Sequence, residues 1–124
     1  MAVRVDNPIE YSKVGIAMQS LLGRRDVAIA VEEGWSIFTE RSGTIWSFVP
    51  LNHPGYPALM RQRVRFAENG TVTVDMAVLC EATKTPCEKV VAEMRERNRH
   101  TAARIMHAAI QRLNAEQGSE PLAP

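Results

Sequence analysis

Apolar residues recur at helical spacing in two segments, one near each end of the chain. The stripe near the N-terminus consists of Val14, Ala17, Met18 and Leu21. Before it, Asn7 can cap a helix, Pro8 suits the first turn, and the Glu10 side chain can reach back to the cap. Gly23 can close the other end. The pattern therefore predicts an amphipathic helix between Asn7 and Gly23.

The stripe near the C-terminus is longer and consists of Val91, Met94, Asn98, Ala102, Ile105, Ala109 and Leu113. Its steps of three or four residues fit one helix of about 28 residues, which is roughly 42 Å long at 1.5 Å per residue. The sequence Thr85-Pro86-Cys87-Glu88 repeats the start signal seen near Asn7. Residues 95–100 are polar, so that two shorter helices with a break there are the competing interpretation.

Between the helices, apolar and polar residues alternate in short runs separated by glycine-containing turns, which indicates strands. Around Gly70, a two-residue Asn-Gly turn would place arginines beside core residues. A three-residue loop from Glu68 to Gly70 instead sets Arg63 opposite Asp75 on the outer face. It also places three pairs on the core side, namely Phe66–Val72, Val64–Val74 and Met60–Val78.

The same burial argument predicts a three-residue loop over residues 32–34 and a four-residue loop over residues 40–43. The core pairs would then be Val31–Trp35, Ile29–Ile37, Ile37–Trp46 and Trp35–Phe48. The predicted fold is α+β: an N-terminal helix, a five-stranded antiparallel meander sheet and a long C-terminal helix packed on one sheet face. Both helices are expected on that face, as a two-layer sandwich. Residues 1–115 would form this single domain, followed by a disordered tail over residues 116–124.

Composition and charge exclude some classes of function. The 124 residues are 45% hydrophobic and 23% charged, with a formal net charge of +1. This balance argues against a bulk electrostatic role on nucleic acid or anionic lipid. No apolar run is long enough to span a membrane, and the first residues lack the apolar core of a signal peptide. The expected compartment is therefore the cytoplasm, and no cofactor is expected.

The two cysteines, Cys80 and Cys87, lie at the end of the last predicted strand and in the first turn of the long helix. Their spacing, with His53, His100 and His107 elsewhere, does not supply the paired ligands of a structural zinc site. A helix N-terminus would favour a reactive thiol, but the spacing is not C-x-x-C. Two buried free thiols are a further alternative. We favour a disulfide, because a tight corner between strand and helix would bring both side chains together.

A set of residues in the middle of the chain resembles a pattern found in small exported proteobacterial proteins of unknown function. The residues are Trp46-Ser47-Phe48, Pro50, His53-Pro54, Tyr56-Pro57-Ala58, Cys80-Glu81-Ala82, Lys84 and Cys87, within residues 26–95. The resemblance implies a disulfide-bearing α+β domain and brings no activity with it. It would place the protein in the periplasm after removal of a leader, whereas the missing leader and the charged extension after Glu93 depart from the pattern.

Two features are candidates for ligand or partner binding. The proline-rich loop over residues 50–57 carries His53 and Tyr56, which could form a proton-transfer pair or grip a ligand, and Tyr56-Pro57 is a candidate cis bond. The alternative is a rigid crossover. On the following strand, Arg61, Arg63 and Arg65 alternate and would project together, either to bind phosphate or as a solvated row with Arg63 paired to Asp75.

Two apolar surfaces would remain uncovered. The predicted registers place apolar side chains on the outer sheet face, namely Phe38, Ile45, Val49, Leu59 and Leu79. The long helix would overhang the sheet with Ala102, Ile105, Ala109 and Leu113 on one face. Either the first helix or the same helix of a second subunit must cover that face, and Asn98 could fix the register of such a pair.

The sequence therefore favours a non-catalytic α+β interaction or binding domain that forms a homodimer. The alternative is a small ligand-binding protein or enzyme that uses a pocket between sheet and helix near His53 and Tyr56. An anion or nucleic-acid interface built on the arginine row is a third interpretation, which the net charge does not favour.

Overall fold

The computed structural model describes residues 2–4 and 9–119, and the side chains of residues 9–115. Its elements are, in chain order, β1 (Ala2–Arg4), α1 (Val14–Leu22), β2 (Val27–Glu32), β3 (Trp35–Glu40), β4 (Ile45–Phe48), β5 (Ala58–Phe66), β6 (Val72–Cys80) and α2 (Lys84–Ser119). The strands form one sheet in the order β1-β6-β5-β4-β3-β2. The predicted α+β fold is confirmed: an N-terminal helix, the five-stranded antiparallel meander β2 to β6, and a long C-terminal helix on one sheet face. The short strand β1, which was not predicted, extends the sheet beside β6.

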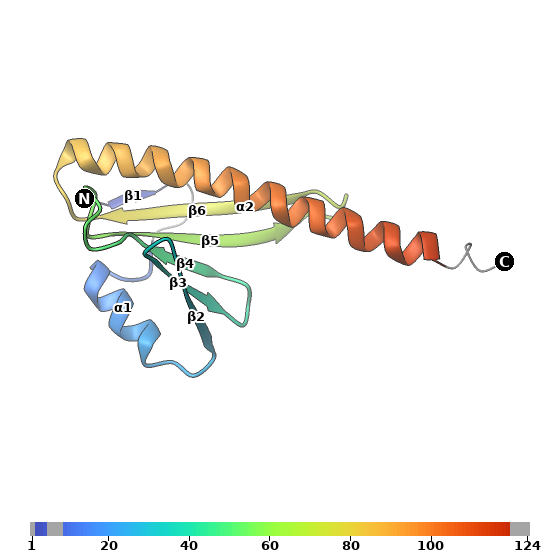
Figure 1. The fold of residues 1–124 in the computed structure, drawn as a ribbon, viewed down its shortest axis with the longest axis horizontal. Coiled ribbons are helices and arrows are strands. Elements are labelled where there is room, and N and C mark those ends of the chain that lie inside the picture. The colour runs from blue at the N-terminus through green and yellow to red at the C-terminus, as the bar shows by residue number, and fades with distance from the viewer. Residues whose placement is uncertain (1, 5–8, 120–124) are drawn as a thin grey trace.

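Helix α2 lies across β5 and β6, on what we call the α2 face of the sheet (Figure 1). Its first half buries Cys87, Val90, Val91 and Met94 against strand residues that point to this face. The strand residues are Trp35, Val49, Ala58, Met60, Met76, Val78 and Cys80. This cluster is the main core, and it follows from the period-2 alternation of the strands and the helical stripe of α2.

Helix α1 lies on the opposite face, the α1 face, so the expectation that both helices share one face is wrong (Figure 1). Val14, Ala17 and Leu21 pack there against Phe38, Trp46, Phe48, Leu59 and Leu79. The apolar outer face predicted from the sequence therefore exists in part, and α1 covers it. Two of its predicted members, Ile45 and Val49, lie on the α2 face instead.

Helix α1 begins later than predicted. Its first residue is Val14, and Lys13 occupies the N-cap position without a side-chain cap. The Val14 backbone N–H instead donates to the Glu81 carboxylate, 3.1 Å away, so that a residue just after β6 caps the helix. The predicted cap residues 7 and 8 lie outside the described residues. The end at Gly23 is confirmed, with its N–H donating to the Gln19 carbonyl.

The β5–β6 hairpin has the predicted register, with Val64 opposite Val74 and Arg63 opposite Asp75. Gly70 closes the three-residue loop with φ of 87°, a conformation that favours glycine. Phe66, predicted on the core side, does pair with Val72, but its side chain is exposed, because the hairpin end extends beyond the helix-covered part of the sheet.

The two preceding hairpins differ from prediction by one residue. Glu32 pairs with Trp35 across the two-residue turn Glu33-Gly34, and Phe38 pairs with Trp46. The shift directs the odd-numbered residues of β2 to the α1 face, namely Val27, Ile29 and Val31. It also moves Trp46 away from α2 and into the cluster under α1.

Helix α2 is continuous through residues 95–100, so the two-helix alternative is wrong. Its 36 residues correspond to about 54 Å, which exceeds the length of the nine-residue strands beneath it, about 30 Å. It ends at Ser119, so that residues 116–119, assigned to a disordered tail by the sequence, are helical. The last five residues, 120–124, lie outside the described part of the chain.

Candidate functional site

The corner between β6 and α2 is closed by the two cysteines. Their Sγ atoms lie at disulfide distance, 2.11 Å, with 5.7 Å between the Cα atoms, which confirms the predicted pairing and excludes two free thiols. Both side chains are buried. The part of the chain that the structure describes contains no group of three or more histidine, cysteine or acidic residues arranged to hold a metal ion. The disulfide links the end of β6 to the first turn of α2.

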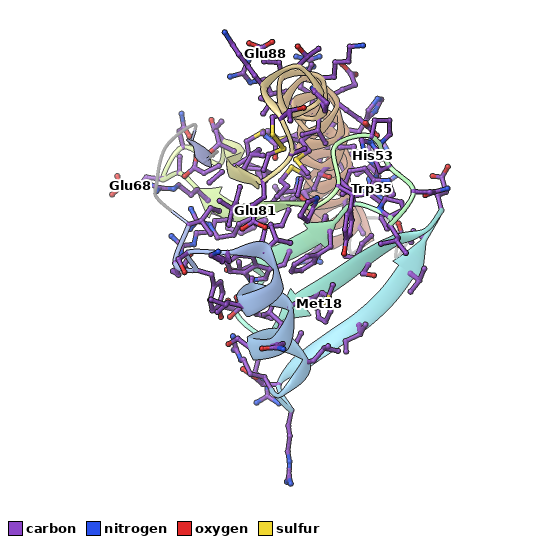
Figure 2. The ribbon with its side chains drawn as sticks, turned by 90° about the vertical axis from the view of Figure 1, so that its left-hand side faces the viewer. Met18, Trp35, His53, Glu68, Glu81 and Glu88 are labelled. Carbon is purple, nitrogen blue, oxygen red and sulfur yellow. A yellow bond between two sulfur atoms is a disulfide. The ribbon has the colours of Figure 1, made fainter. Side chains whose placement is uncertain are left out.

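The loop over residues 50–57 is fastened to α2 by His53. Its Nε2 lies 2.8 Å from the Glu93 carboxylate, and its Nδ1 accepts a hydrogen bond from the Gly55 backbone N–H at 2.9 Å. The ring also packs edge-on against Trp35, and both residues lie on the same side of α2 in Figure 2. Because both ring nitrogens have partners, His53 acts here as a clamp between loop and helix.

The rest of this loop fits the same structural role. The Tyr56–Pro57 bond is cis, as the sequence suggested. Gly55 lies so close to α2 that a Cβ there would come within 2.9 Å of the Val90 Cβ, so only glycine permits this approach. Tyr56 is exposed and forms no proton-transfer pair with His53 among the contacts of the described residues. These contacts fit the rigid-crossover interpretation, and a role of His53 and Tyr56 in ligand binding stays a prediction.

The three arginines of β5 share the α1 face, but each has an acidic partner. Arg61 is 1% exposed and pairs with Glu10 at 2.5 Å, and Arg63 pairs with the other Glu10 oxygen at 2.6 Å. Arg65 pairs with Asp75, which the sequence had assigned to Arg63. Burial raises the pKa of Glu10, but the hydrogen bond from Arg61 and the two nearby positive charges outweigh it and lower the pKa overall. The three arginines of the row thus share two carboxylates, Glu10 and Asp75, which neutralise part of its charge.

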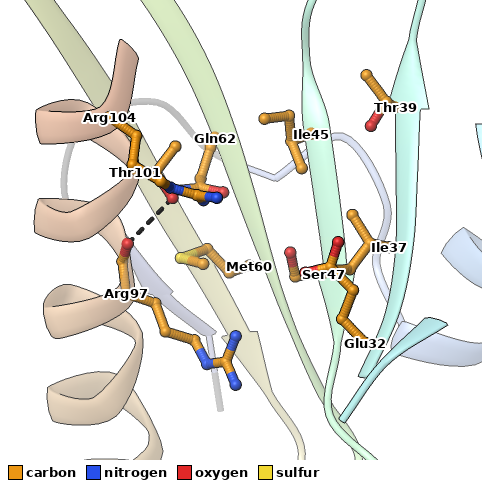
Figure 3. A pocket seen from close by; sticks show the side chains of 10 residues that line it. All are labelled: Glu32, Ile37, Thr39, Ile45, Ser47, Met60, Gln62, Arg97, Thr101 and Arg104. Carbon is orange, nitrogen blue, oxygen red and sulfur yellow. Dashed lines mark hydrogen bonds between the residues drawn. The ribbon is translucent and has the colours of Figure 1, made fainter. Parts of the chain in front are cut away.

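A groove runs between α2 and the strands β3 to β5 on the α2 face (Figure 3). It encloses about 220 Å³ and is lined by Glu32, Ile37, Thr39, Ile45, Ser47, Met60, Gln62, Arg97, Thr101 and Arg104. Neither His53 nor Tyr56 lines it. Arg97 stacks on the Trp35 ring at 3.9 Å, and Thr101 donates to the Arg97 carbonyl, the dashed line in Figure 3. Ile45, predicted to bind a partner on the outer face, belongs to this groove.

Asn98 joins α2 to both strands beneath it, β5 and β6. Its side-chain amide donates to the Val74 carbonyl at 2.9 Å, and its carbonyl accepts from Gln62 at 3.0 Å. Both hydrogen-bonding groups of Asn98 are therefore used within the chain. These contacts explain its place in the apolar stripe, and its role in the register of a helix pair stays a prediction.

Beyond Asn98, the apolar face of α2 is largely uncovered. Ile110 is 48% exposed and Leu113 is 55% exposed, while Ala102, Ile105, Met106 and Ala109 are partly exposed. Figure 1 shows the C-terminal end of this half of the helix projecting past the ends of β5 and β6. The sequence offered two segments that could cover this face, namely the first helix and a helix of a second subunit. The first helix, α1, lies on the other side of the sheet and does not reach the face. We call these six residues the free face of α2.

The sequence predicted most residues of the free face but did not predict the groove. Arg97, Thr101 and Arg104 lie at helical spacing beside the core stripe, and this spacing is the signal that could have identified them. Phe38, a candidate for partner binding, is buried under α1 and is not available.

Comparison with known proteins adds no identity: no family model, curated protein or solved structure matches the chain. Within the described residues, no helix is both long and apolar enough to cross a membrane.

Proposed function

We propose that the protein is a non-catalytic interaction domain that forms a homodimer through the free face of α2. The observation that carries this proposal is the second half of α2, residues 99–119, whose free face is partly exposed up to Ala109 and about half exposed at Ile110 and Leu113. In proteins, most of the stability of a helix comes from packing of its apolar face. The partner helix would supply that packing.

A second copy of the chain is the occupant that fits best. Full burial of an exposed Ile or Leu side chain contributes roughly 1.5–3 kcal/mol, and the gain for Ile110 and Leu113 is about half of that, because each is already about half buried within one chain. Ala102 and Ala109 lie on the same face, and their small side chains let two helices approach closely. The net charge of +1 gives little electrostatic opposition to self-association.

The test is the change in mass caused by a charge on this face. In light scattering, the wild-type protein is expected to have at least twice the mass of one chain, and Ile105→Glu should halve that mass while the protein stays folded. Gln111→Glu is the matched control, because it adds the same charge to the same half of α2 on the side opposite the free face, at about 100° per residue. It should leave the mass unchanged.

A wild-type protein that has the mass of one chain from micromolar to millimolar concentration would contradict the proposal. Equal effects of Ile105→Glu and Gln111→Glu would also contradict it, because they would show a dependence on charge rather than on this face. Circular dichroism of each variant distinguishes dissociation from unfolding.

A small ligand is the competing function, and the groove beside α2 is the observation that favours it. Arg97 and Arg104 line the groove together with the hydroxyl groups of Thr39 and Thr101, a combination suited to a small carboxylate or phosphate. Titration with such anions followed by calorimetry tests this function. Binding that disappears in Arg104→Ala would support a ligand site, and no heat signal at millimolar anion would argue against it.

We also propose that the protein works in an oxidising compartment, as the resemblance to exported proteins implies. The support is the Cys80–Cys87 pair at disulfide distance, because such bonds persist in oxidising compartments and are rare in the cytosol. Mass spectrometry of unreduced protein purified from its native cells should show a chain lighter by two hydrogen atoms. Complete alkylation of both cysteines without reductant would restore the cytoplasmic assignment.

A further inference from the structure

Strand β2 forms an edge of the sheet, and no strand in the described part of the chain pairs with its outer side. Five of its six residues are exposed, including Ile29 at 53% and Val31 at 69%. Its sequence, VAIAVE, is apolar on both faces until the final glutamate. An apolar strand with free backbone groups is a template for pairing with another strand.

Monomeric proteins usually protect such an edge, and among the described residues the protection of β2 is limited to the charge of Glu32 at its end. The strand contains no proline and no lysine. Its pairing with β3 is continuous over all six residues, so no bulge twists the edge away. The opposite end of the sheet differs, because β1 covers the outer side of β6 there.

The turn after β2 fixes which backbone groups point outward. Glu33 and Gly34 both have positive φ, 53° and 85°, as in a two-residue hairpin turn. In such a hairpin the flanking pair, Glu32 and Trp35, exchanges backbone hydrogen bonds, and the bonding alternates along the strand. The N–H and C=O groups of Val27, Ile29 and Val31 are therefore directed away from β3.

We infer that two copies of the chain pair antiparallel through β2, so that their sheets join edge to edge across a two-fold axis. The inference is independent of the α2 proposal, because it rests on a different surface. The register that centres on Ile29 sets Ile29 opposite itself and Val27 opposite Val31 of the copy. Each outward-directed residue then exchanges backbone hydrogen bonds with the copy, and the apolar residues on both faces meet like residues.

Charges at the strand ends favour this register. It brings Arg25 beside the turn residue Glu33 of the copy, and within the described residues neither has an ion-pair partner. The register also sets Asp26 opposite Glu32, two acidic residues. The Arg24 guanidinium, 2.6 Å from the Asp26 carboxylate, offsets that repulsion.

The first test compares masses. Ile29→Lys places two ammonium groups opposite each other at the two-fold axis, which should halve the mass measured by light scattering. Phe66→Lys is the matched control, because Phe66 is also an exposed apolar strand residue but lies at the far end of β5. It should leave the mass unchanged. An unchanged mass for Ile29→Lys would overturn the inference.

Combining this variant with the α2 variant separates the two proposals. If both surfaces associate, Ile29→Lys and Ile105→Glu should each halve the wild-type mass, and the double variant should have the mass of one chain. If Ile105→Glu alone already gives the mass of one chain, β2 pairing is overturned. If Ile29→Lys alone does so and Ile105→Glu changes nothing, β2 pairing stands and the α2 interface is the one that fails.

A crosslinking experiment covers the case in which Ile29→Lys does not fold. In the predicted register, two copies of Ile29→Cys have Cα atoms about 5.5 Å apart. Two copies of Val31→Cys, although more exposed, would be offset by four residues, or about 14 Å along the strands. A short homobifunctional thiol reagent should therefore join Ile29→Cys chains in high yield and Val31→Cys chains several-fold less. Equal crosslinking of the two variants, or none of Ile29→Cys, would overturn the register.

Discussion

The two halves of helix α2 both carry an apolar face but have different surroundings. Up to Asn98, the helix is held by the disulfide and by Val90, Val91 and Met94, all buried against the sheet. After Asn98, Ile110 and Leu113 occupy the equivalent stripe and remain about half exposed. The helix continues without a break between the two environments.

This difference shows that the apolar stripe of α2 is longer than the part that packs into the core of one chain. The stripe is continuous along α2, but the sheet can cover only its first half, because the strands are shorter than the helix. The part of an apolar stripe that the sheet does not cover is either covered by another surface or exposed to water, where it lowers the solubility of the protein. The second half of α2 therefore has an apolar face that the sheet of the same chain does not cover.

The largest expected effect concerns Met94, which is fully buried. Met94→Ala should lower the free energy of unfolding by about 2–5 kcal/mol, through lost burial and a cavity. Leu113→Ala, at low protein concentration where the chains are dissociated, should change it by less than about 0.5 kcal/mol. Urea unfolding monitored by tryptophan fluorescence measures both, and equal losses would show that the second half is packed within one chain.

The disulfide should have the next largest effect. Replacing both cysteines by alanine removes a crosslink that closes a loop of about eight residues, which should cost about 2–3 kcal/mol by chain entropy. Hydrogen exchange should locate the loss. Amides in the first turns of α2 should exchange faster, and those after Asn98 should keep their wild-type rates. Faster exchange in the second half as well would mean that the two halves unfold together.

At the junction, Asn98→Ala should cost about 1–3 kcal/mol, because it leaves the Val74 carbonyl and the Gln62 amide without their partner. Asn98→Asp is a useful second variant, since it keeps the acceptor for Gln62 and removes the donor to Val74. It should fall between wild type and Asn98→Ala in thermal unfolding. If Asn98→Ala instead changes the oligomeric mass without changing stability, Asn98 contacts a second subunit.

The smallest effect comes from a matched pair of glycine substitutions on exposed positions, one in each half of α2. Ala92→Gly in the first half should cost about 1 kcal/mol, the difference in helix propensity. Ala103→Gly should cost the same only if the second half folds cooperatively with the domain. Under dissociating conditions we expect a loss several-fold smaller for Ala103→Gly, measured by urea unfolding of both variants side by side.

Several features could be predicted because a local constraint decides them. The β5–β6 register follows from Gly70 and from the cost of placing arginines in the core. The Cys80–Cys87 pair follows from the short corner that separates the two residues. The continuous stripe of α2 follows from its spacing alone. In each case, neighbouring residues favour the observed structure, although free thiols and a break in α2 at residues 95–100 remained alternatives until the structure excluded them.

The register of β2 and β3 was wrong because burial does not choose between the two faces there. If only one face of the sheet is covered, burial directs Ile29 and Val31 toward α2. With α1 on the opposite side, an apolar residue is acceptable on either face, and the turn at Glu33-Gly34 decides the register instead. The sequence does not reveal on which face a short helix will pack.

The start of α1 and the groove depend on contacts between residues that are distant in sequence. Asn7 and Pro8 form a plausible start signal, but the N–H of Val14 is satisfied by Glu81, 67 residues further along the chain. The groove likewise combines Arg97 and Arg104 of α2 with Glu32 of β2. Such sites require the assembled fold and have no local pattern.

The contact between Glu81 and α1 also determines where this chain could accept extra residues. Glu81 follows Cys80 directly, its N–H donates to the Pro57 carbonyl, and its side chain caps a helix on the far side of the sheet. One residue inserted into this corner would displace the cap and the disulfide together. By contrast, the β3–β4 turn at Gly43 has open space around it. A peptide tag or a fluorescent label is therefore best inserted in that turn. A shortened or lengthened corner would disturb both the start of α1 and the start of α2.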